Sequence, residues 1–288
     1  MRSRRAPWRI HYLLARRVPP VPSPVLVAAN AILERRGYRV TGWIAEETLI
    51  RPDELEPRHD LYLLKSHTEL SLSLAGVLHS QGARVLNPYP ACASAQDKLR
   101  TSRRLAAAGV PVPRSWTTSD LSLLSEALDE TPLIVKPHNG HRGAGITIVR
   151  DRAQLAAMPA PSSPVIVQEY IPGPGHDLKV YVVGEEVFAV RKPFSESSFT
   201  QPGVPVPVTE DVRRVALRCG RAAGLGLYGI DVIESADGPV VVDLNHFPGY
   251  KGVADVAPLI AEYVDAYASG AVELGGTEPV PSLPDSAA

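Results

Sequence analysis

The stretch that most constrains this chain runs from Gly229 to Gly252, GIDVIESADGPVVVDLNHFPGYKG. Its two short β-branched runs, joined at Asp237-Gly238, predict a hairpin. Alternation along the second run puts Asp243 and Asn245 on one face, and Asp231 in the first run can converge with them. Such oxygen donors suit Mg²⁺, and also Mn²⁺. The stretch therefore predicts a metal-binding hairpin, with an exposed polar face as the alternative.

Composition indicates an ordinary globular protein with more than one lobe. Its 288 residues are 44% hydrophobic and 21% charged. Thirty Lys plus Arg against 31 Asp plus Glu give a net charge of −1, which does not favour nucleic-acid or membrane binding. No apolar run approaches the length of a membrane span. The choice between a monomer and a homo-oligomer stays open.

The cysteines and the chain ends suggest where the protein works. Cys92 and Cys219 are far apart and lack metal-ligand spacing, which argues against a disulfide framework or a zinc site. The first residues have no apolar signal-peptide core. We therefore expect a reducing cytoplasm. Residues 1–9 predict a basic tail, and residues 268–288, rich in Gly, Pro and Ser, predict a poorly ordered one.

The first part of the chain alternates between strand and helix patterns. The expected strands are residues 10–15, 39–44, 60–65 and 83–86, and the expected helices are residues 25–36 and 70–80. This alternation predicts a small parallel α/β lobe.

The rest of the chain is mainly β with a few helices. A basic amphipathic helix at 95–108 closes at Gly109, and Pro111 and Pro113 hold the following segment extended. Further strands are expected at 132–136, 146–150 and 165–171, a hairpin at 178–191, a mobile loop at 195–208, and helices at 121–128, 211–223 and 256–267.

A glycine-rich loop, HNGHRGAG, follows the expected strand that ends at Lys136. The backbone N–H groups of Gly140, Gly143 and Gly145 can approach an anion without obstruction, which suits phosphate beside an ammonium group. The loop joins two strands and opens no helix, so it is not a P-loop. A tight turn with a snorkelling lysine explains it equally well. Lys98 is a second phosphate candidate, with a solvated helix residue as the alternative.

Several later residues also suit a nucleotide. Gln168, Glu169, Tyr170 and Ile171 end a strand where backbone groups can meet a purine edge, and Asp177 can accept from ribose hydroxyls. Lys179, Arg191 and Lys192 lie on the next hairpin, where cations can stabilise charge that develops during phosphoryl transfer. Each residue has a structural explanation when it is taken singly.

Taken in order, these features closely resemble the ATP-grasp superfamily from about Asn87 to Gly252. The resemblance implies an α/β and α+β fold, in which an N-terminal pre-ATP-grasp parallel α/β lobe precedes two ATP-grasp α+β subdomains that clasp ATP. The implied divisions are 10–90 for the N-terminal domain and 91–267 for the ATP-grasp domain, the latter comprising a linking helical segment at 91–131, a glycine-loop subdomain at 132–175 and a metal-binding subdomain at 176–267.

The resemblance also implies roles. Lys98 and Lys136 would contact phosphates beneath the loop from His138 to Gly145. Glu169 to Ile171 and Asp177 would hold adenosine, while Asp231, Asp243 and Asn245 would bind two Mg²⁺ ions that bridge the phosphates. In most of the superfamily, ATP phosphorylates a carboxylate and an amine then attacks the acyl phosphate.

Two branches of the superfamily compete. The segments NPYPACASAQDKLRTSRRLAAAGVPVPRSW and KPHNGHRGAGI are similar to RimK-like ligases, whereas LKVYVVGEEVFAVRKPF and VVVDLNHFPGYKGV resemble the inositol 1,3,4-trisphosphate 5/6-kinases. Asp243 and Lys179, where the ligases usually have Glu and Arg, favour the kinases. Against them, the second downstream histidine of the inositol kinases is missing, and Ile146 stands near its position.

We expect a Mg-ATP-dependent ligase that forms an amide or peptide bond, through an acyl phosphate, on the carboxylate of a small-molecule, amino-acid or peptide substrate. The alternative is a small-molecule kinase. In the ligase, the cations would hold the substrate carboxylate and its acyl phosphate, and the residues after Asn245 would line the acceptor pocket. The expected substrate residues are His141, Arg142, His246, Gly249 and Lys251. Phe247 is expected to pack at the hairpin end, and His11, His59, His67 and His79 to be structural or exposed.

Overall fold

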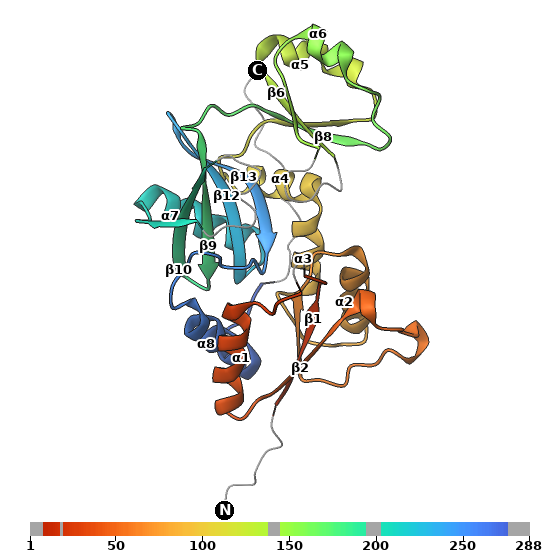
Figure 1. Ribbon diagram of the computed structural model, residues 1–288, viewed down its shortest axis with the longest axis vertical. Coiled ribbons are helices and arrows are strands. Elements are labelled where there is room, and N and C mark those ends of the chain that lie inside the picture. Colours follow the sequence, from red (N-terminus) through yellow and green to blue (C-terminus); the bar gives the residue numbers. More distant parts are fainter. Residues whose placement is uncertain (1–7, 18–19, 138–144, 194–202, 276–288) are drawn as a thin grey trace, which may run out of the picture.

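The computed structural model describes residues 8–17, 20–137, 145–193 and 203–275. Three β-sheets follow one another along an elongated molecule, as Figure 1 shows. The strands run in the orders β2-β1-β3-β4, β5-β8-β6-β7 and β11-β10-β9-β12-β13. The expected sequence of a parallel sheet followed by two antiparallel sheets is confirmed.

The first sheet is the expected parallel one. Its strands are β1 (Arg9–Leu14), β2 (Arg39–Ile44), β3 (Leu61–Lys65) and β4 (Val85–Leu86), and its helices are α1 (Pro24–Arg35) and α2 (Glu69–Ser80). The apolar runs of the central strands β1 and β3 are almost wholly buried, as expected for strands covered on both faces. The predicted basic tail, residues 1–9, was wrong at its end, because Trp8 packs against the core and β1 begins at Arg9.

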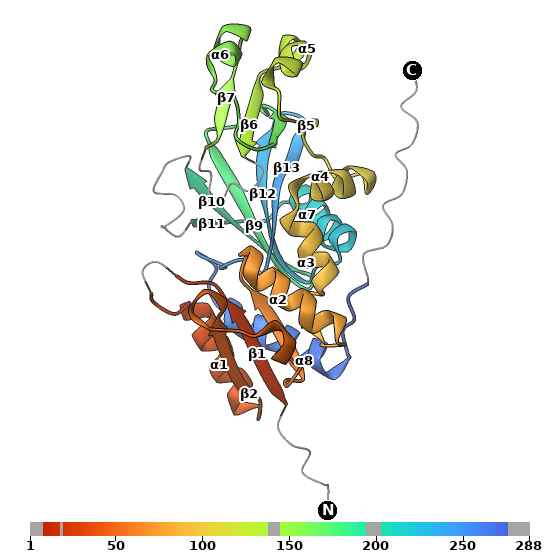
Figure 2. The ribbon, with the colours of Figure 1, turned by 90° about the vertical axis from the view of Figure 1, so that its right-hand side faces the viewer.

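The second sheet carries its helices at the far end of the molecule (Figures 1 and 2). Its elements are β5 (Ser115–Thr118), η3 (Leu121–Leu124), α5 (Ser125–Glu130), β6 (Leu133–Pro137), β7 (Thr147–Val149), α6 (Arg152–Ala157) and β8 (Val165–Glu169). A small core joins Leu121, Leu124 and Leu128 to Leu133 and Val167. Helix α6 was not predicted. Asp151 caps its N-terminus by accepting from the Gln154 amide at 2.8 Å.

The third sheet is the largest. Its elements are β9 (His176–Val183), β10 (Glu186–Pro193), β11 (Val204–Val206), α7 (Glu210–Ala223), β12 (Leu227–Ser235) and β13 (Gly238–His246). Helix α7 packs Val215, Ala216 and Cys219 against Val180 and Ile230 on one face. The predicted loop at 195–208 was wrong at 204–206, which pair with β10 as a strand; residues 195–202 of that loop lie in a part that the structure does not describe.

A pair of helices links the first two sheets. The single helix predicted at 95–108 was wrong: α3 (Tyr89–Gln96) and α4 (Lys98–Ala107) meet at Asp97. Asp97 has extended backbone, and its carboxylate accepts from the amides of Leu99 and Arg100 at 3.0 and 3.1 Å. An aspartate that can cap a new helix ends the old one, because its side chain competes for backbone N–H groups.

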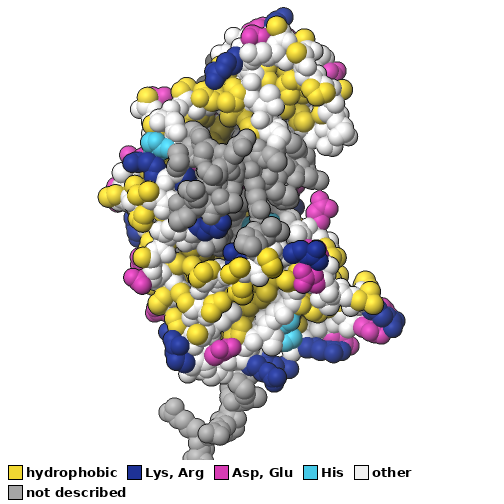
Figure 3. All heavy atoms as spheres, viewed as in Figure 1, with side chains coloured by type: hydrophobic (Ala, Val, Ile, Leu, Met, Phe, Trp, Pro, Cys, Tyr) yellow, Lys and Arg dark blue, Asp and Glu magenta, His cyan; other side chains and the backbone are white. Residues whose placement is uncertain are grey.

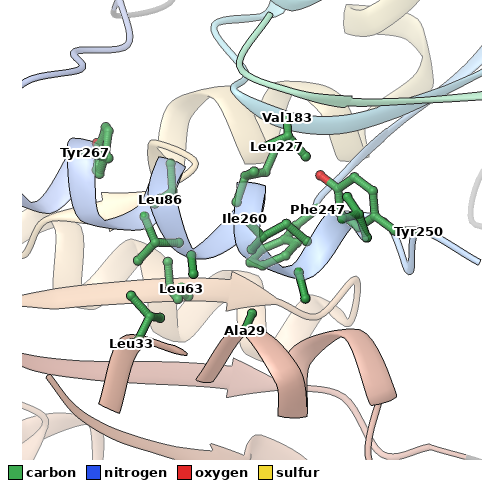
Figure 4. Packing of buried hydrophobic residues seen from close by; sticks show 14 of the residues in the cluster. Ala29, Leu33, Leu63, Leu86, Val183, Leu227, Phe247, Tyr250, Ile260 and Tyr267 are labelled. Carbon is green, nitrogen blue, oxygen red and sulfur yellow. The ribbon is translucent and has the colours of Figure 1, made fainter. Parts of the chain in front are cut away.

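Helix α8 (Val256–Ser269) fastens the third sheet to the N-terminal lobe. Figure 4 shows one core in which Leu33 of α1 and Leu63 of β3 lie near Ile260 of α8, with Phe247 and Tyr250 beside them. The predicted C-terminal tail was wrong at its start, since α8 extends through Ser269 and Val272 and Leu274 pack against this core. The N-terminal lobe and the third sheet therefore share one hydrophobic core.

No helix within the described ranges has the length and apolarity needed to cross a membrane. Acidic and basic side chains are interspersed over the face in Figure 3, with hydrophobic side chains between them. Cys92 and Cys219 are free and buried. Short 3₁₀ helices, η1 (Ala45–Glu47) and η2 (Pro52–Glu54), complete the N-terminal lobe.

Candidate functional site

The predicted hairpin brings two carboxylates face to face. Asp231 of β12 pairs with Asp243 of β13 in the antiparallel register. The next pair is Val232 with Val241, so Val242 is an extra residue in β13, a β-bulge. The bulge sets Asp243 directly opposite Asp231. Asn245 lies two residues on, with its amide nitrogen 3.4 Å from the Asp243 carboxylate.

Each carboxylate has a lysine partner from another element. Lys98, the first residue of α4, places Nζ 2.9 Å from Oδ1 of Asp243. Lys179 of β9 places Nζ 2.7 Å from Oδ2 of Asp231 and 3.1 Å from Oδ2 of Asp177. The helix break at Asp97 directs Lys98 to this site, because it starts α4 beside β13. Three acidic and two basic groups thus meet in a partly buried cluster.

Burial and neighbouring charge act in opposite directions on these groups. Burial raises the pKa of Asp231, and the attraction of Lys179 only partly offsets it. Burial would also raise the pKa of Asp243, but Lys98 and then Lys136 outweigh it and hold that pKa below its usual value. The Lys179 pKa is raised: burial would lower it, but Asp231 and Asp177 prevail. The cluster therefore favours the charged forms of Lys179 and Asp243.

The donor set fits a hard divalent cation. Two carboxylates opposite each other repel, and a cation between them would relieve that repulsion more fully than one ammonium group on each side. Within the described residues, no three His, Cys, Asp or Glu side chains are placed so that all of them could hold one metal ion. The third predicted ligand is the amide oxygen of Asn245. Such a set leaves room for phosphate oxygens and water, as Mg²⁺ requires.

A pocket opens beside Asp243 and reaches from the third sheet to the second. The cavity itself is small, about 20 Å³. Its lining includes Thr101 and Ser102 of α4, Lys136 of β6, Ile166 and Gln168 of β8, and Val241 of β13. Lys136 donates to the Gln168 side chain at 2.5 Å. Burial lowers the Lys136 pKa, which the negative charge of Asp243 opposes.

The residues predicted to hold adenosine are only partly brought together. Gln168 lines the pocket, whereas the Glu169 carboxylate turns to Arg114, 2.8 Å from its Nε. The Tyr170 amide donates to Pro132 at 2.8 Å, so that donor is used within the protein. Half-buried Ile171 follows β8. Asp177 lies with Lys179 in the carboxylate cluster.

The predicted cations separate into two sets. Lys179 and Lys192 share a face of the third sheet, since Lys192 pairs with Asp177 two residues before Lys179. Only 3% of Lys192 is exposed. Arg191 points to the opposite face, where Nη2 lies 3.1 Å from Oε2 of Glu234. The structure therefore does not bring Arg191 to the other two. Gly140, His141, Arg142 and Gly143 lie outside the described residues, which resume at Gly145.

The turn after β13 is tightly built. Phe247 and Tyr250 both have positive φ, 42° and 51°, and the Tyr250 hydroxyl donates to Val182 at 2.9 Å. Phe247 is fully buried, so its predicted packing role is confirmed. Gly249 and Lys251 are exposed in this turn. A Cβ on Gly252 would stand 2.6 Å from the Gly203 carbonyl oxygen, so only glycine fits there.

Sequence reasoning missed residues that the fold brings to the site. Thr101 and Ser102 line the pocket because α4 starts at Lys98, a break that helical periodicity did not reveal. His67, expected to be structural or exposed, lies with its ring centroid 4.3 Å from that of His246. The one signal for His67 was its place just after an apolar strand, where side chains of a parallel sheet often meet ligands.

Comparisons with known proteins agree on one family. Residues 95–264 match the family model of a RimK-like ATP-grasp domain. A probable alpha-L-glutamate ligase from Xanthomonas oryzae pv. oryzae (strain MAFF 311018) is 31% identical over 267 residues, which cover 85% of this chain and 86% of that protein.

Solved structures have the same fold. A RimK domain ATP-grasp protein from Sphaerobacter thermophilus DSM 20745 superposes with a TM-score of 0.70 at 21% identity, covering 88% of this chain and 98% of the other. The ATP-grasp ligase PsnB, complexed with a minimal precursor, Mg and ADP, has a TM-score of 0.65 at 20% identity and covers 89% and 96% of the two chains. The family match spans both carboxylates, Lys98, Lys136 and the pocket between the sheets.

Proposed function

This chain belongs to the RimK-like ATP-grasp family of ATP-dependent carboxylate–amine ligases, and we propose that it joins an amino acid to the carboxylate of a small molecule or peptide. The observation that carries the proposal is the carboxylate pair, Asp231 opposite Asp243, beside a pocket that contains Lys136. The name of the similar Xanthomonas protein makes L-glutamate the first amine to test.

The pocket accounts for the nucleotide. ATP would lie between the second and third sheets, with its base against Ile166 and Gln168 and its phosphates toward Lys98 and Lys136. Lys98, now 2.9 Å from Asp243, would turn to the phosphates once a metal replaces it at that carboxylate. Two Mg²⁺ ions held by Asp231, Asp243 and Asn245 would neutralise the phosphate charge when bound.

The remaining cations account for the acyl transfer. In the proposed reaction, the substrate carboxylate attacks the γ-phosphorus of ATP, ADP leaves, and the amine then displaces phosphate from the acyl phosphate. Lys179 stands at the carboxylate pair and Lys192 on the same sheet face, so both can stabilise negative charge on the transferred group. Arg191 is left out of this proposal because it faces Glu234.

The ligase interpretation is favoured over the kinase alternative by the relatives, which are named as ligases. The Asp at position 243 does not decide the matter, since Asp and Glu both provide carboxylate oxygens. The reducing cytoplasm predicted from the cysteines fits the two free thiols and remains part of the proposal.

The test is an assay of products. The purified chain would be incubated with Mg-ATP, L-glutamate and a set of amino-acid and peptide carboxylates, and ADP, phosphate and new amides would be measured by enzymatic coupling and mass spectrometry. We expect equal amounts of ADP, phosphate and amide. A phosphorylated product without an amide would instead support the kinase.

A further inference from the structure

A groove away from the reaction site runs between α7 and α8, beside the turn that joins β9 to β10. Its cavity measures about 640 Å³. Its lining comes from that turn, from the second half of α7, from the connection to β12, from α8 and from the segment that follows α8. Lys179, at the carboxylate pair, is five residues before Gly184 of the turn, so about 17 Å of strand separates the two. The groove is therefore not part of the nucleotide or metal site.

The walls of the groove are apolar. They include half-buried side chains from α7, from α8 and from the segment after α8, namely Leu217, Leu259, Tyr263, Val272 and Leu274. The floor is close to the backbone, since a Cβ on Gly226 would stand 1.9 Å from the Tyr263 hydroxyl oxygen. A Cβ on Gly220 would stand 2.3 Å from that of Tyr228. A contiguous apolar surface of this kind is typical of an interaction site.

The rim of the groove is acidic. Glu185 and Glu186 of the turn, Glu262 of α8 and Glu273 after α8 line it, and all four are exposed. Among the residues that the structure describes, none of these carboxylates takes part in an ion pair. Arg221 of α7 is the one base in this described lining, which therefore has a formal charge of −3, against −1 for the whole chain.

The charge of the rim selects between occupants. The four acids come from three separate elements, so one small cation would meet only part of them, whereas an apolar segment with several basic side chains would meet them all. The sequence after Gly275 contains Glu278 and Asp285 but no Lys or Arg, so the chain's own C-terminus does not complement the rim. A second copy bound symmetrically would bring acid against acid, because a two-fold interface joins the same surface to itself.

We propose that this groove docks an amphipathic α-helix of a partner protein. Apolar side chains at i, i+3, i+4 and i+7 of that helix pack against Leu217 and Leu259, on the two walls, and its Lys or Arg side chains face the glutamates of the rim. The partner binds away from the carboxylate pair and leaves the nucleotide pocket open. The proposal goes beyond the proposed ligase function and does not depend on it.

The first experiment uses a model peptide of about 18 residues, long enough for five helical turns, with leucine at the helical spacing and lysine elsewhere. Fluorescein-labelled peptide would be titrated with the full chain at physiological ionic strength and followed by fluorescence polarisation. We expect micromolar binding, and about tenfold weaker binding or less for a peptide with glutamate in place of lysine and for one of scrambled order. No binding of the lysine peptide, or equal binding of all three, would overturn the proposal.

The second experiment reverses one charge of the rim. Glu262→Lys changes an exposed residue and should weaken the lysine peptide about fivefold or more, while the glutamate peptide gains affinity. Glu46→Lys is the matched control, since Glu46 is exposed on η1 of the N-terminal lobe and outside the groove, and it should change the affinity less than about twofold. Equal losses for the two variants would mean that net charge, and not the groove, attracts the peptide.

Hydrogen–deuterium exchange locates the bound peptide and separates this proposal from the ligase function. We expect the lysine peptide to slow exchange in α7, α8 and the turn between β9 and β10, and a non-hydrolysable ATP analogue not to compete with it. Slower exchange in β6 and β8, or competition with the analogue, would disprove the groove. A wild-type dimer that Glu262→Lys dissociates, seen by sedimentation, would overturn the proposal in favour of a second copy. Peptide binding without any amide formation would disprove only the ligase function.

Discussion

At the scale of single residues, the candidate site is a balance of charge. Asp231 and Asp243 are kept close by the hairpin, and Lys179 and Lys98 approach them from a neighbouring strand and a helix. A lysine beside each carboxylate stabilises the pair without a metal. The same arrangement lets a cation displace an ammonium group and release it toward phosphate. The proposed site thus needs Asp243 for its charge more than for its volume.

Replacing Asp243 with asparagine tests this. The variant keeps the shape of the side chain but loses the charge that would hold a metal, so we expect kcat to fall about a hundredfold or more while the melting temperature stays near that of wild type. ADP release would be measured across a Mg²⁺ titration. Asp237→Asn, in the exposed turn of the same hairpin, is the control and should behave as wild type. Full activity of Asp243→Asn would refute the metal assignment.

A buried histidine of the N-terminal lobe makes a pH prediction. His11 is 8% exposed, with Nδ1 2.8 Å from the Thr41 hydroxyl oxygen, and burial followed by the nearby His59 lowers its pKa from 6.5 to about 4. Between pH 6.5 and about pH 4, His11 therefore binds a proton in the unfolded chain but not in the folded chain. The stabilisation from neutral His11 is therefore complete above pH 6.5 and is lost as the pH falls toward 4, by up to about 3 kcal/mol.

The measurement is urea unfolding from pH 7.5 to pH 4 for wild type and His11→Asn, in which the amide can keep the Thr41 contact. Carboxylates titrate in both proteins, so the difference between their free energies of unfolding isolates His11. The free energy of unfolding of wild type minus that of His11→Asn should therefore decrease as the pH falls. A difference that is constant with pH would mean that His11 titrates normally in the folded protein.

At the scale of elements, one asparagine ties the N-terminal lobe to the third sheet. The Asn87 side chain follows β4 and is fully buried. Its oxygen accepts from the amides of Gly226 and Leu227 at 2.8 and 2.9 Å, and its nitrogen donates to the Leu227 carbonyl at 2.8 Å. Two buried backbone N–H groups where β12 begins therefore depend on this one side chain, whereas the Leu227 carbonyl also accepts from the Phe247 amide at 2.7 Å.

We expect Asn87→Ala to lower the free energy of unfolding by about 3 kcal/mol or more, since each abandoned buried group costs about 1–3 kcal/mol. Gln81→Ala is the matched control. Gln81 is exposed, and its side-chain amide donates one hydrogen bond to the Leu55 carbonyl at 2.8 Å. The loss of this bond should cost about 1 kcal/mol or less. Both would be measured by chemical denaturation. Similar decreases in the free energy of unfolding for the two variants would show that the buried hydrogen bonds of Asn87 contribute no more than the single exposed one of Gln81.

Elements with strong periodicity were predictable, and their irregularities were not. Alternation located the strands of the hairpin around Asp237-Gly238, and Gly224 in the left-handed conformation ends α7 where an apolar helical pattern stops. The bulge at Val242 was not predicted because it depends on how β13 pairs with β12. The break at Asp97 has a local cause, the capping of the Leu99 and Arg100 amides, but the helical periodicity of the segment concealed it. Yet these two irregularities direct Lys98 and Asp243 toward each other. The chemistry of the site was therefore easier to predict than its geometry.

At the scale of the whole molecule, the sites form between sheets. The proposed nucleotide pocket takes residues from the second and third sheets, and the ring contact between His67 and His246 joins the first and third. Nothing in the local sequence joins His67 to His246, since their contact requires the N-terminal lobe to pack against α8 and the end of β13. Sequence patterns indicated the separate lobes and the residues for ATP and metal. The substrate side could not be read from them, because it depends on how the lobes pack.

This division predicts which parts of the molecule a nucleotide will stabilise. The pocket lining joins Lys136 and Gln168 in the second sheet to Val241 in the third, so ATP bound there would bridge the two sheets. Binding at a hundred times Kd adds about 2.7 kcal/mol to the folded state. With Mg²⁺ and a non-hydrolysable ATP analogue, hydrogen exchange of the backbone amides should slow in β6, β8 and β13. The exchange rates in β1 and β2 should stay unchanged.

Hydrogen–deuterium exchange with mass spectrometry would measure these rates, and Lys136→Ala would serve as the comparison. Lys136 supplies the ammonium group between the two sheets, so its loss should weaken analogue binding about tenfold or more and reduce protection on both sides of the pocket at the same analogue concentration. Protection confined to the third sheet would move the nucleotide away from β6 and β8, and protection that spreads through β1 would mean that the N-terminal lobe also closes on it.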